Sequence, residues 1–219
     1  MSTNNYAAAV RGYRDELGAA MQYADADLVP EAVATRKRAR VHAARRALLA
    51  ARPALPQSLP TRDGVIASLR PKNADEIARV QHEAAKVQAF LNSGRSLGQI
   101  IANADETRAL AIADMIETLP ATLESQSGDE IIAEVHGLVF DRLADLGVEA
   151  AASVRNAEQQ HAPALAWHRA MSEAAEGSDA SIAAWQDVYR ADPDGYEAIR
   201  VGLDGAVDQW VGRLDAADK

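Results

Sequence analysis

Alanine dominates this chain, and that restricts it to a helical fold. Of the 219 residues, 48 are alanine, whereas Leu, Ile and Val together number 43 and Phe only two. Alanine is the best helix former, and its small side chain lets helices approach one another closely. The sequence shows no convincing strand pattern. We therefore predict an all-α multi-helix bundle with a thin core, in which an N-terminal helical hairpin is joined to the rest by a proline-rich connection.

The hairpin is predicted from two helical segments separated by a short break at residues 25–29. In the first, residues 5–24, large apolar side chains recur every three or four positions: Tyr6, Val10, Tyr13, Leu17 and Met21. The second begins at Pro30, a residue suited to the first helical position, and has its own apolar stripe of Val33, Val41, Ala44 and Leu48. We expect the two stripes to meet.

The second of these helices is also the most basic stretch of the chain. Residues 30–52 hold seven of the 23 Lys and Arg side chains beside a single acid, Glu31. Lys37 falls within the apolar stripe, where its aliphatic stem can lie along apolar surface. The other six form a predicted basic interaction face: Arg36, Arg38, Arg40, Arg45, Arg46 and Arg52.

Charge is divided unevenly along the sequence. Residues 1–72 carry 12 basic and 6 acidic side chains, whereas residues 73–219 carry 11 basic and 26 acidic ones, for a net charge of −9. Pro53, Pro56 and Pro60 favour an extended connection between the two parts. We therefore expect three regions: a helical hairpin at 1–52, a proline-rich connector at 53–62 and an acidic helical bundle at 63–219.

Helix-capping residues and a proline predict where several helices of the acidic region begin or are interrupted. Asn73 and Asp105 are suitable N-caps, and Ser127 with Glu130 forms a capping-box pattern. A long helical segment, residues 149–176, contains Pro163, which we expect to kink or split it near His161.

The last predicted helix starts at Pro193 and carries a possible interaction surface. Its apolar residues lie close to a heptad spacing and form a predicted apolar interaction seam of Tyr196, Ile199, Leu203 and Trp210. Gly202, Gly205 and Gly212 lie beside this seam. A glycine strip permits close approach by another helix, although neutral drift would produce the same pattern.

The sequence contains no complete catalytic or metal-binding motif. Glu158 and His161 form the only Glu-x-x-His spacing, whereas di-iron bundles need two such pairs and two more carboxylates. Phosphate-binding glycine motifs and the GxSxG nucleophile motif are absent, and there is no cysteine. We predict no catalytic residues, no metal and no cofactor, and hence no enzymatic activity.

Three functions remain as hypotheses, in order of preference. The first is a non-enzymatic helical assembly or adaptor protein that acts through protein contacts, with itself or a partner, as a structural subunit of a larger assembly such as a virion. The second is a nucleic-acid-binding protein that uses residues 36–52 against phosphates, although the acidic remainder would repel a polyanion. The third is an enzyme whose site is assembled from distant residues. Without an apolar run of membrane-spanning length, we expect no membrane, and a soluble protein of the cytoplasm or of a virion.

Overall fold

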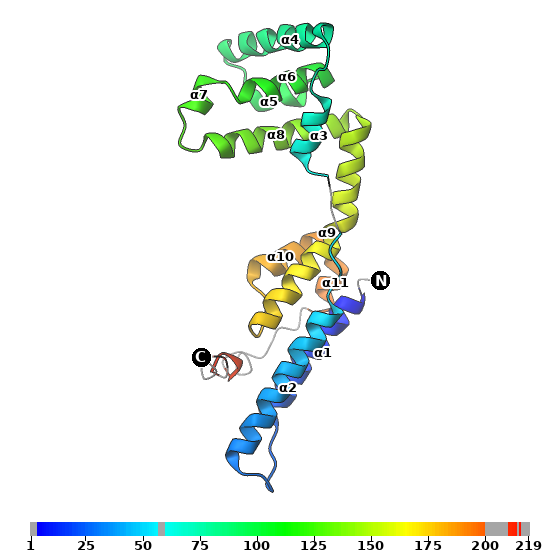
Figure 1. The fold of residues 1–219 in the computed structure, drawn as a ribbon, viewed down its shortest axis with the longest axis vertical. Helices are drawn as coiled ribbons and strands as arrows, with labels where there is room; N and C mark the ends of the chain where they lie inside the picture. Colours follow the sequence, from blue (N-terminus) through cyan, green and yellow to red (C-terminus); the bar gives the residue numbers. More distant parts are fainter. Residues whose placement is uncertain (1–3, 57–59, 200–209, 214, 216–219) are drawn as a thin grey trace. The chain divides into compact units, whose positions relative to one another are not determined.

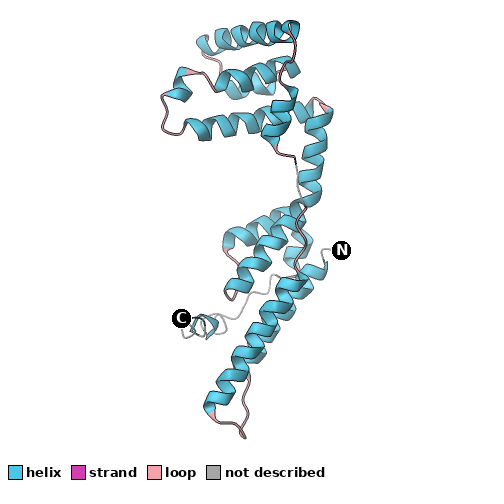
Figure 2. Cartoon of the chain, viewed as in Figure 1, coloured by secondary structure: helices cyan, strands magenta, loops and turns pink. Residues whose placement is uncertain are grey.

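The protein is all-α, as predicted. The computed structural model describes residues 4–56, 60–199, 210–213 and 215, and these residues contain helices and connecting turns but no strand (Figure 2). Leu203, Gly202 and Gly205 of the predicted seam and glycine strip lie outside the described residues. Within the described chain, no helix has the length and apolarity needed to cross a membrane.

The helices follow one another along the chain with short connections. Their bounds are α1 Asn4–Gln22, α2 Pro30–Ala51, α3 Arg62–Leu69, α4 Ala74–Asn92, α5 Leu97–Ala102, α6 Glu106–Ile116, α7 Pro120–Leu123, α8 Gly128–Asp145, α9 Glu149–Glu176, α10 Ile182–Ala191 and α11 Pro193–Glu197. Residues 210–213 are also helical.

The chain forms two compact units, and they differ from the division expected from the sequence. The first unit combines residues 1–56 with residues 160–219, and the second contains residues 57–159. The basic N-terminal helices therefore share a unit with the acidic C-terminal segment. The first unit contains 14 basic and 16 acidic side chains, and the second 9 and 16, so most of the net negative charge belongs to the second unit.

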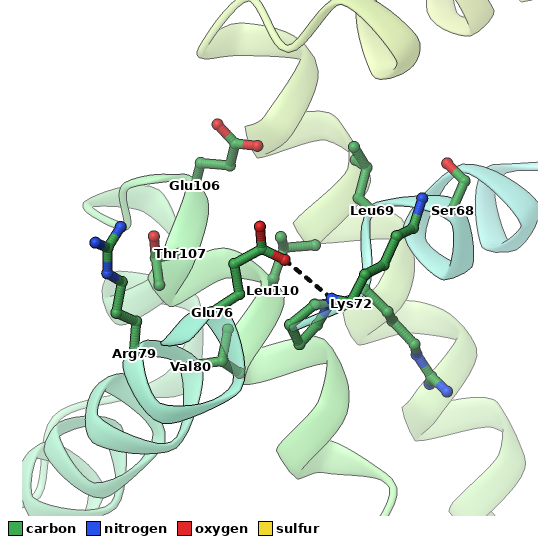
Figure 3. A pocket seen from close by; sticks show the side chains of 11 residues that line it. Ser68, Leu69, Lys72, Glu76, Arg79, Val80, Glu106, Thr107 and Leu110 are labelled. Carbon is green, nitrogen blue, oxygen red and sulfur yellow. Dashed lines mark hydrogen bonds between the residues drawn. The ribbon is translucent and has the colours of Figure 1, made fainter. Parts of the chain in front are cut away.

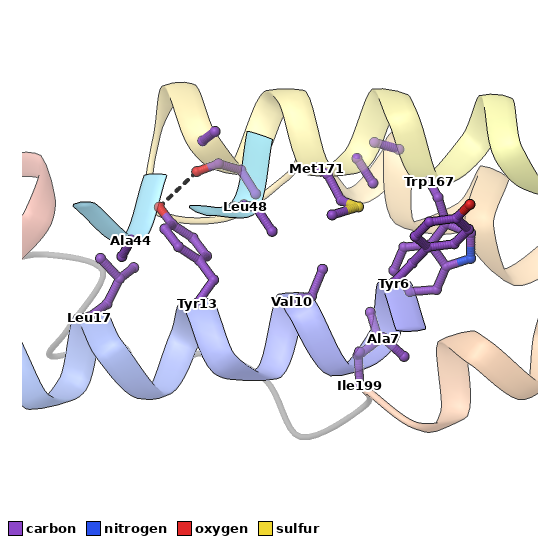
Figure 4. Packing of buried hydrophobic residues seen from close by; sticks show 14 of the residues in the cluster. Tyr6, Ala7, Val10, Tyr13, Leu17, Ala44, Leu48, Trp167, Met171 and Ile199 are labelled. Atoms are coloured by element: carbon purple, nitrogen blue, oxygen red, sulfur yellow. Dashed lines mark hydrogen bonds between the residues drawn. The ribbon is translucent and has the colours of Figure 1, made fainter. Parts of the chain in front are cut away.

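In the first unit, α1 packs along α2 and along the C-terminal half of α9 (Figure 1). Four of the five residues of the predicted α1 stripe are buried, and Figure 4 shows their side chains directed toward α9: Tyr6, Val10, Tyr13 and Leu17. Met21, the fifth, is partly buried against the same core. Trp167 and Met171 of α9 are completely buried in this core. Tyr6 lies against Trp167 with ring centroids 6.1 Å apart, and Trp185 of α10 meets Trp167 edge to face at 6.2 Å.

The second unit has its own core, built around α6. This helix packs between α4 and α8, and α3 and α5 cover further sides of α8 (Figure 1). Ile112 of α6, Phe140 and Leu143 of α8 and Val87 of α4 are fully buried. The N-terminal part of α9 joins this core through Ala151 and Val154. Each unit therefore buries its own apolar residues, and α9 contributes to both cores.

Three local expectations differ from the structure in whole or in part. α9 continues through Pro163 as one helix, so it is not split near His161. Ser127 precedes α8 but makes no side-chain capping hydrogen bond. α11 ends at Glu197, so Tyr196 and Ile199 do not lie on one long helix from Pro193.

Candidate interaction surface

The predicted basic face of α2 is largely engaged inside the first unit, and Arg45 shows this most clearly. Its guanidinium donates to both carboxylate oxygens of Asp215, at 2.9 and 2.7 Å, and to the carbonyl oxygen of Gly177 at 2.9 Å. The Arg45 side chain is only 15% exposed. Hydrogen bonding to Asp215 raises the pKa of Arg45 above its usual value, so this residue stays charged.

The carbonyl groups at the C-terminal end of α9 receive hydrogen bonds from the same region of α1 and α2. The Tyr13 hydroxyl lies 2.9 Å from the carbonyl oxygen of Ala174 (Figure 4) and 3.1 Å from that of Gly177, within donating distance of both. Helix ends leave such carbonyls without intrahelical partners, and cations are favoured near them. Burial raises the pKa of the Tyr13 hydroxyl, which therefore remains a neutral donor. Tyr13 and Arg45 together fix the end of α9 against α1 and α2.

Other cations of α2 hold the turn that connects it to α1. Arg36 donates to the Tyr23 hydroxyl at 2.8 Å and pairs with Asp25 at 3.2 Å. The Arg40 guanidinium lies 4.8 Å from the centroid of the Tyr23 ring. These two arginines stabilise the connection between the helices.

The remaining basic side chains differ in exposure. Arg38 is half-buried and has an interaction partner, whereas Arg52 is exposed and donates to the Ser172 hydroxyl at 3.0 Å. Arg46 is exposed and has no ion pair with another described residue. Since most of these cations already have partners within the first unit, few of them are available to bind phosphate groups.

The predicted apolar seam contributes to the core of the first unit. Ile199 is 3% exposed, and Tyr196 and Trp210 are partly buried against the same core. Trp210 also lies beside Lys37, whose ammonium group is 5.8 Å from the ring centroid. Gly212 is exposed, and no described atom lies within 4 Å of where a Cβ would stand, so no close approach within the described chain occurs there.

Two polar interactions in the first unit were not predicted. One guanidinium nitrogen of Arg14, Nη2, donates to both carboxylate oxygens of Asp179, at 2.8 and 3.1 Å, and the guanidinium lies 5.4 Å from the centroid of the Trp185 ring. Buried Asp192 accepts a hydrogen bond from the Trp167 indole at 2.8 Å and another from the Gly195 backbone at 3.1 Å, which caps α11. No local sequence signal links Asp192 to Trp167, which lies 25 residues earlier in the chain.

The second unit contains a polar hollow of about 430 Å³ beside α4 and α6 (Figure 3). Lys72 and Arg79 lie on either side of Glu76 rather than converging on one point. Glu76 accepts a hydrogen bond from the Lys72 backbone at 2.9 Å, which lowers the pKa of its carboxyl group. Arg70, which also lines the hollow, pairs with Glu117 at 2.6 Å. The Arg70–Glu117 pair and the backbone hydrogen bond to Glu76 favour a structural role for these two charges.

The Glu-x-x-His pair has a structural explanation. Glu158 accepts hydrogen bonds from Arg62 at 2.8 to 3.2 Å, and Arg62 also pairs with Asp141 of α8 at 3.1 Å. This contact joins the first helix of the second unit to the last. Among the described residues, no group of three or more His, Asp or Glu side chains is arranged to hold a metal ion.

An apolar groove in the first unit is the surface best suited to protein contact. It lies between α9 and α10, has a volume of about 430 Å³, and is lined by Ala162, Leu165, Ala166, Arg169, Asp187, Arg190 and Ala191. Leu165 is 40% exposed although it is apolar. Asp187 pairs with Arg169 at 2.7 Å and lies 3.7 Å from Arg190, whose side chain is 74% exposed. Sequence reasoning missed this groove because it arises where two helices meet.

Comparison with protein-family models, with curated proteins and with solved structures found no match to this chain.

Proposed function

We propose that this protein is a non-enzymatic helical assembly protein that associates with further copies of itself, as a structural subunit of a larger assembly such as a virion. The observation that carries the proposal is the apolar groove between α9 and α10. Apolar surface rimmed by charged residues is typical of protein interaction sites. The small side chains of Ala162, Ala166 and Ala191 allow a helix to approach closely.

Charge complementarity favours a second copy as the occupant of this groove. The second unit carries the excess of acidic side chains, and α8 presents several of them along one face. Glu130, Glu134 and Leu138 recur there at a spacing of four and are all exposed. A helix face with two carboxylates followed by an exposed leucine complements a groove that exposes Leu165 and the guanidinium of Arg190. Such contacts steer and orient association, while apolar burial supplies most of the affinity.

A contact between different surfaces of identical chains is heterologous. It generates a ring when the rotation between copies closes and an open filament when it does not. This kind of contact suits a subunit of a large assembly. Each added copy leaves one α9–α10 groove and one α8 face free at the ends of the assembly, so further copies can bind.

The test is the self-association of a Leu165→Glu variant. A carboxylate placed in the groove would replace apolar surface and would pair with Arg169 or Arg190, the cations that would otherwise face the acidic partner, so we expect association to weaken by about 30-fold or more, equivalent to about 2 kcal/mol. Sedimentation analysis over a range of protein concentrations measures this effect. Gln186→Glu is the matched control, since Gln186 is exposed on α10 but does not line the groove.

Thermal unfolding separates an interface effect from a folding defect. Because Leu165 is already 40% exposed, we expect its replacement to leave the unfolding temperature within about 3 °C of the original. Wild-type protein that stays monomeric at high concentration, or a Leu165→Glu variant that associates like the wild type, would contradict the proposed function.

A further inference from the structure

A second hollow of the second unit differs in charge from its surroundings. It has a volume of about 400 Å³ and lies where α4, α5 and α6 meet. Six of the described residues line it, and none of them is acidic: Phe90, Arg95, Gln99, Ile100, Asn103 and Arg108. The second unit as a whole has 9 basic and 16 acidic side chains. A hollow that gathers two of the basic side chains and none of the acidic ones is suited to a negatively charged ligand.

The C-terminal end of α4 holds Arg95 over Phe90. Gly94 has a φ of 88°, and its N–H donates to the Leu91 carbonyl oxygen at 2.9 Å, while the Arg95 N–H donates to the Phe90 carbonyl oxygen at 3.2 Å. These two hydrogen bonds are those of a Schellman motif. The Arg95 guanidinium lies 4.7 Å from the centroid of the Phe90 ring. The backbone and a cation–π contact therefore position this cation without an ion pair.

The hydrogen-bond donors around the hollow are only partly used. Arg95 has no carboxylate partner among the described residues, and its side chain is exposed. Arg108 donates to Glu83 from Nε at 2.9 Å and from Nη2 at 2.8 Å, which leaves Nη1 without an acceptor in the described chain. Asn103 donates to the Gln99 backbone carbonyl at 2.8 Å, and this contact fixes the Asn103 amide beside the hollow. An anion in the hollow would therefore meet two guanidinium groups with free donors.

We propose that this hollow binds a small organic anion in which a carboxylate is attached to an aromatic ring. The planar guanidinium of Arg95 presents parallel N–H donors that match the two oxygens of a carboxylate. Guanidinium groups and phenyl rings both stack with aromatic rings, so Arg95 and Phe90 also favour a flat apolar body next to the charge. A volume of about 400 Å³ lies within the range of small-molecule pockets.

The site is independent of the proposed assembly contact. None of its six residues lines the α9–α10 groove, and none belongs to α8. The proposal therefore adds a ligand to the second unit, beyond the proposed function of the protein.

Titration of the full chain with 2-naphthoate, followed in amide NMR spectra, tests the site. For a ligand of this size we expect a dissociation constant on the order of 1 mM or lower, with shifts concentrated in residues 90–108. Arg95→Gln should weaken binding by about tenfold or more, because it removes the cation of the hollow that has no ion pair. The neutral amide 2-naphthamide should bind the unaltered chain more weakly by a similar factor.

Three controls accompany the titration. Arg79→Gln is the matched variant, because Arg79 is also an exposed arginine of the second unit but lines the other hollow, and it should change the affinity by less than about twofold. Inorganic phosphate should bind more weakly than 2-naphthoate, because it gains nothing from Phe90. Since Arg95 is exposed, thermal unfolding of Arg95→Gln should stay within about 3 °C of the original.

Any of four results would overturn the proposal: no saturable binding of 2-naphthoate up to about 20 mM, equal binding of 2-naphthamide, phosphate binding as tight as that of 2-naphthoate, or equal losses in Arg95→Gln and Arg79→Gln. None of these results bears on the assembly function, which depends on Leu165.

Discussion

Replacement of Asp192 by alanine is expected to destabilise the first unit by about 3 kcal/mol. The carboxylate is buried and serves two donors at once, the Trp167 indole and the Gly195 backbone. Removing it leaves a buried indole N–H without an acceptor, which costs about 1–3 kcal/mol, and removes a helix cap worth about 1 kcal/mol. For a unit of this size the loss corresponds to a fall in unfolding temperature of roughly 10 °C.

Neighbouring positions provide the comparison for this prediction. Asp194 is acidic and lies on the same short helix, but it is exposed, so Asp194→Ala should change stability by less than about 1 kcal/mol. Gly195→Ala should be as damaging as Asp192→Ala, because its Cβ would collide with the Asp192 carboxylate and stand 3.0 Å from Cζ2 of Trp167. Thermal unfolding followed by circular dichroism measures all three variants. Equal stability of Asp192→Ala and Asp194→Ala would show that the indole hydrogen bond contributes nothing.

Helices and their ends were predictable because their signals are local. Asn73 and Asp105 accept the capping hydrogen bonds expected of them. All of the α1 stripe except Met21 is buried, as its spacing indicated. Helix caps and apolar stripes depend on residues three or four positions apart, and such spacings can be read directly from the sequence.

The division into units was not predictable from such patterns. It depends on residues 160–219 returning to the N-terminal helices, and the contacts that fix this return join Tyr13 to Ala174, Arg14 to Asp179 and Arg45 to Asp215. No spacing rule connects positions more than 160 residues apart. The charge asymmetry of the sequence did hold a usable signal, because a basic helix in an otherwise acidic chain has many acidic partners available.

The proposed groove was not among the predicted surfaces. An apolar seam beside glycines was expected at Tyr196, Ile199, Leu203 and Trp210; of its described residues, Ile199 is buried, and Tyr196 and Trp210 pack partly buried against the core of the first unit. Leu165, which the structure exposes beside Arg190, was not predicted. Heptad-like spacing identifies an apolar face but cannot say whether the chain itself covers it. Here the stripe of α1 and the aromatic residues of α9 and α10 provide that cover.

Unfolding of the full chain is expected to show two transitions that separate mutations shift independently. Phe140 is fully buried in the second unit, with the Arg62 guanidinium 4.7 Å from its ring centroid. Phe140→Ala should cost about 3–5 kcal/mol and lower one transition, while Asp192→Ala lowers the other. Differential scanning calorimetry of the two single variants and the double variant measures the shifts, and their effects should add in the double variant.

α9 contributes to both cores, so the calorimetry also tests whether this helix couples the unfolding of the two units. α9 supplies Ala151 and Val154 to one core and Trp167 and Met171 to the other, so a stiff helix could transmit unfolding from one unit to the next. Between these sets lies Pro163, which removes a backbone hydrogen bond and weakens the helix there. We therefore expect that when one unit unfolds, the half of α9 packed in the other unit remains helical. A single transition lowered equally by Phe140→Ala and Asp192→Ala would instead show that α9 couples the two cores into one cooperative domain.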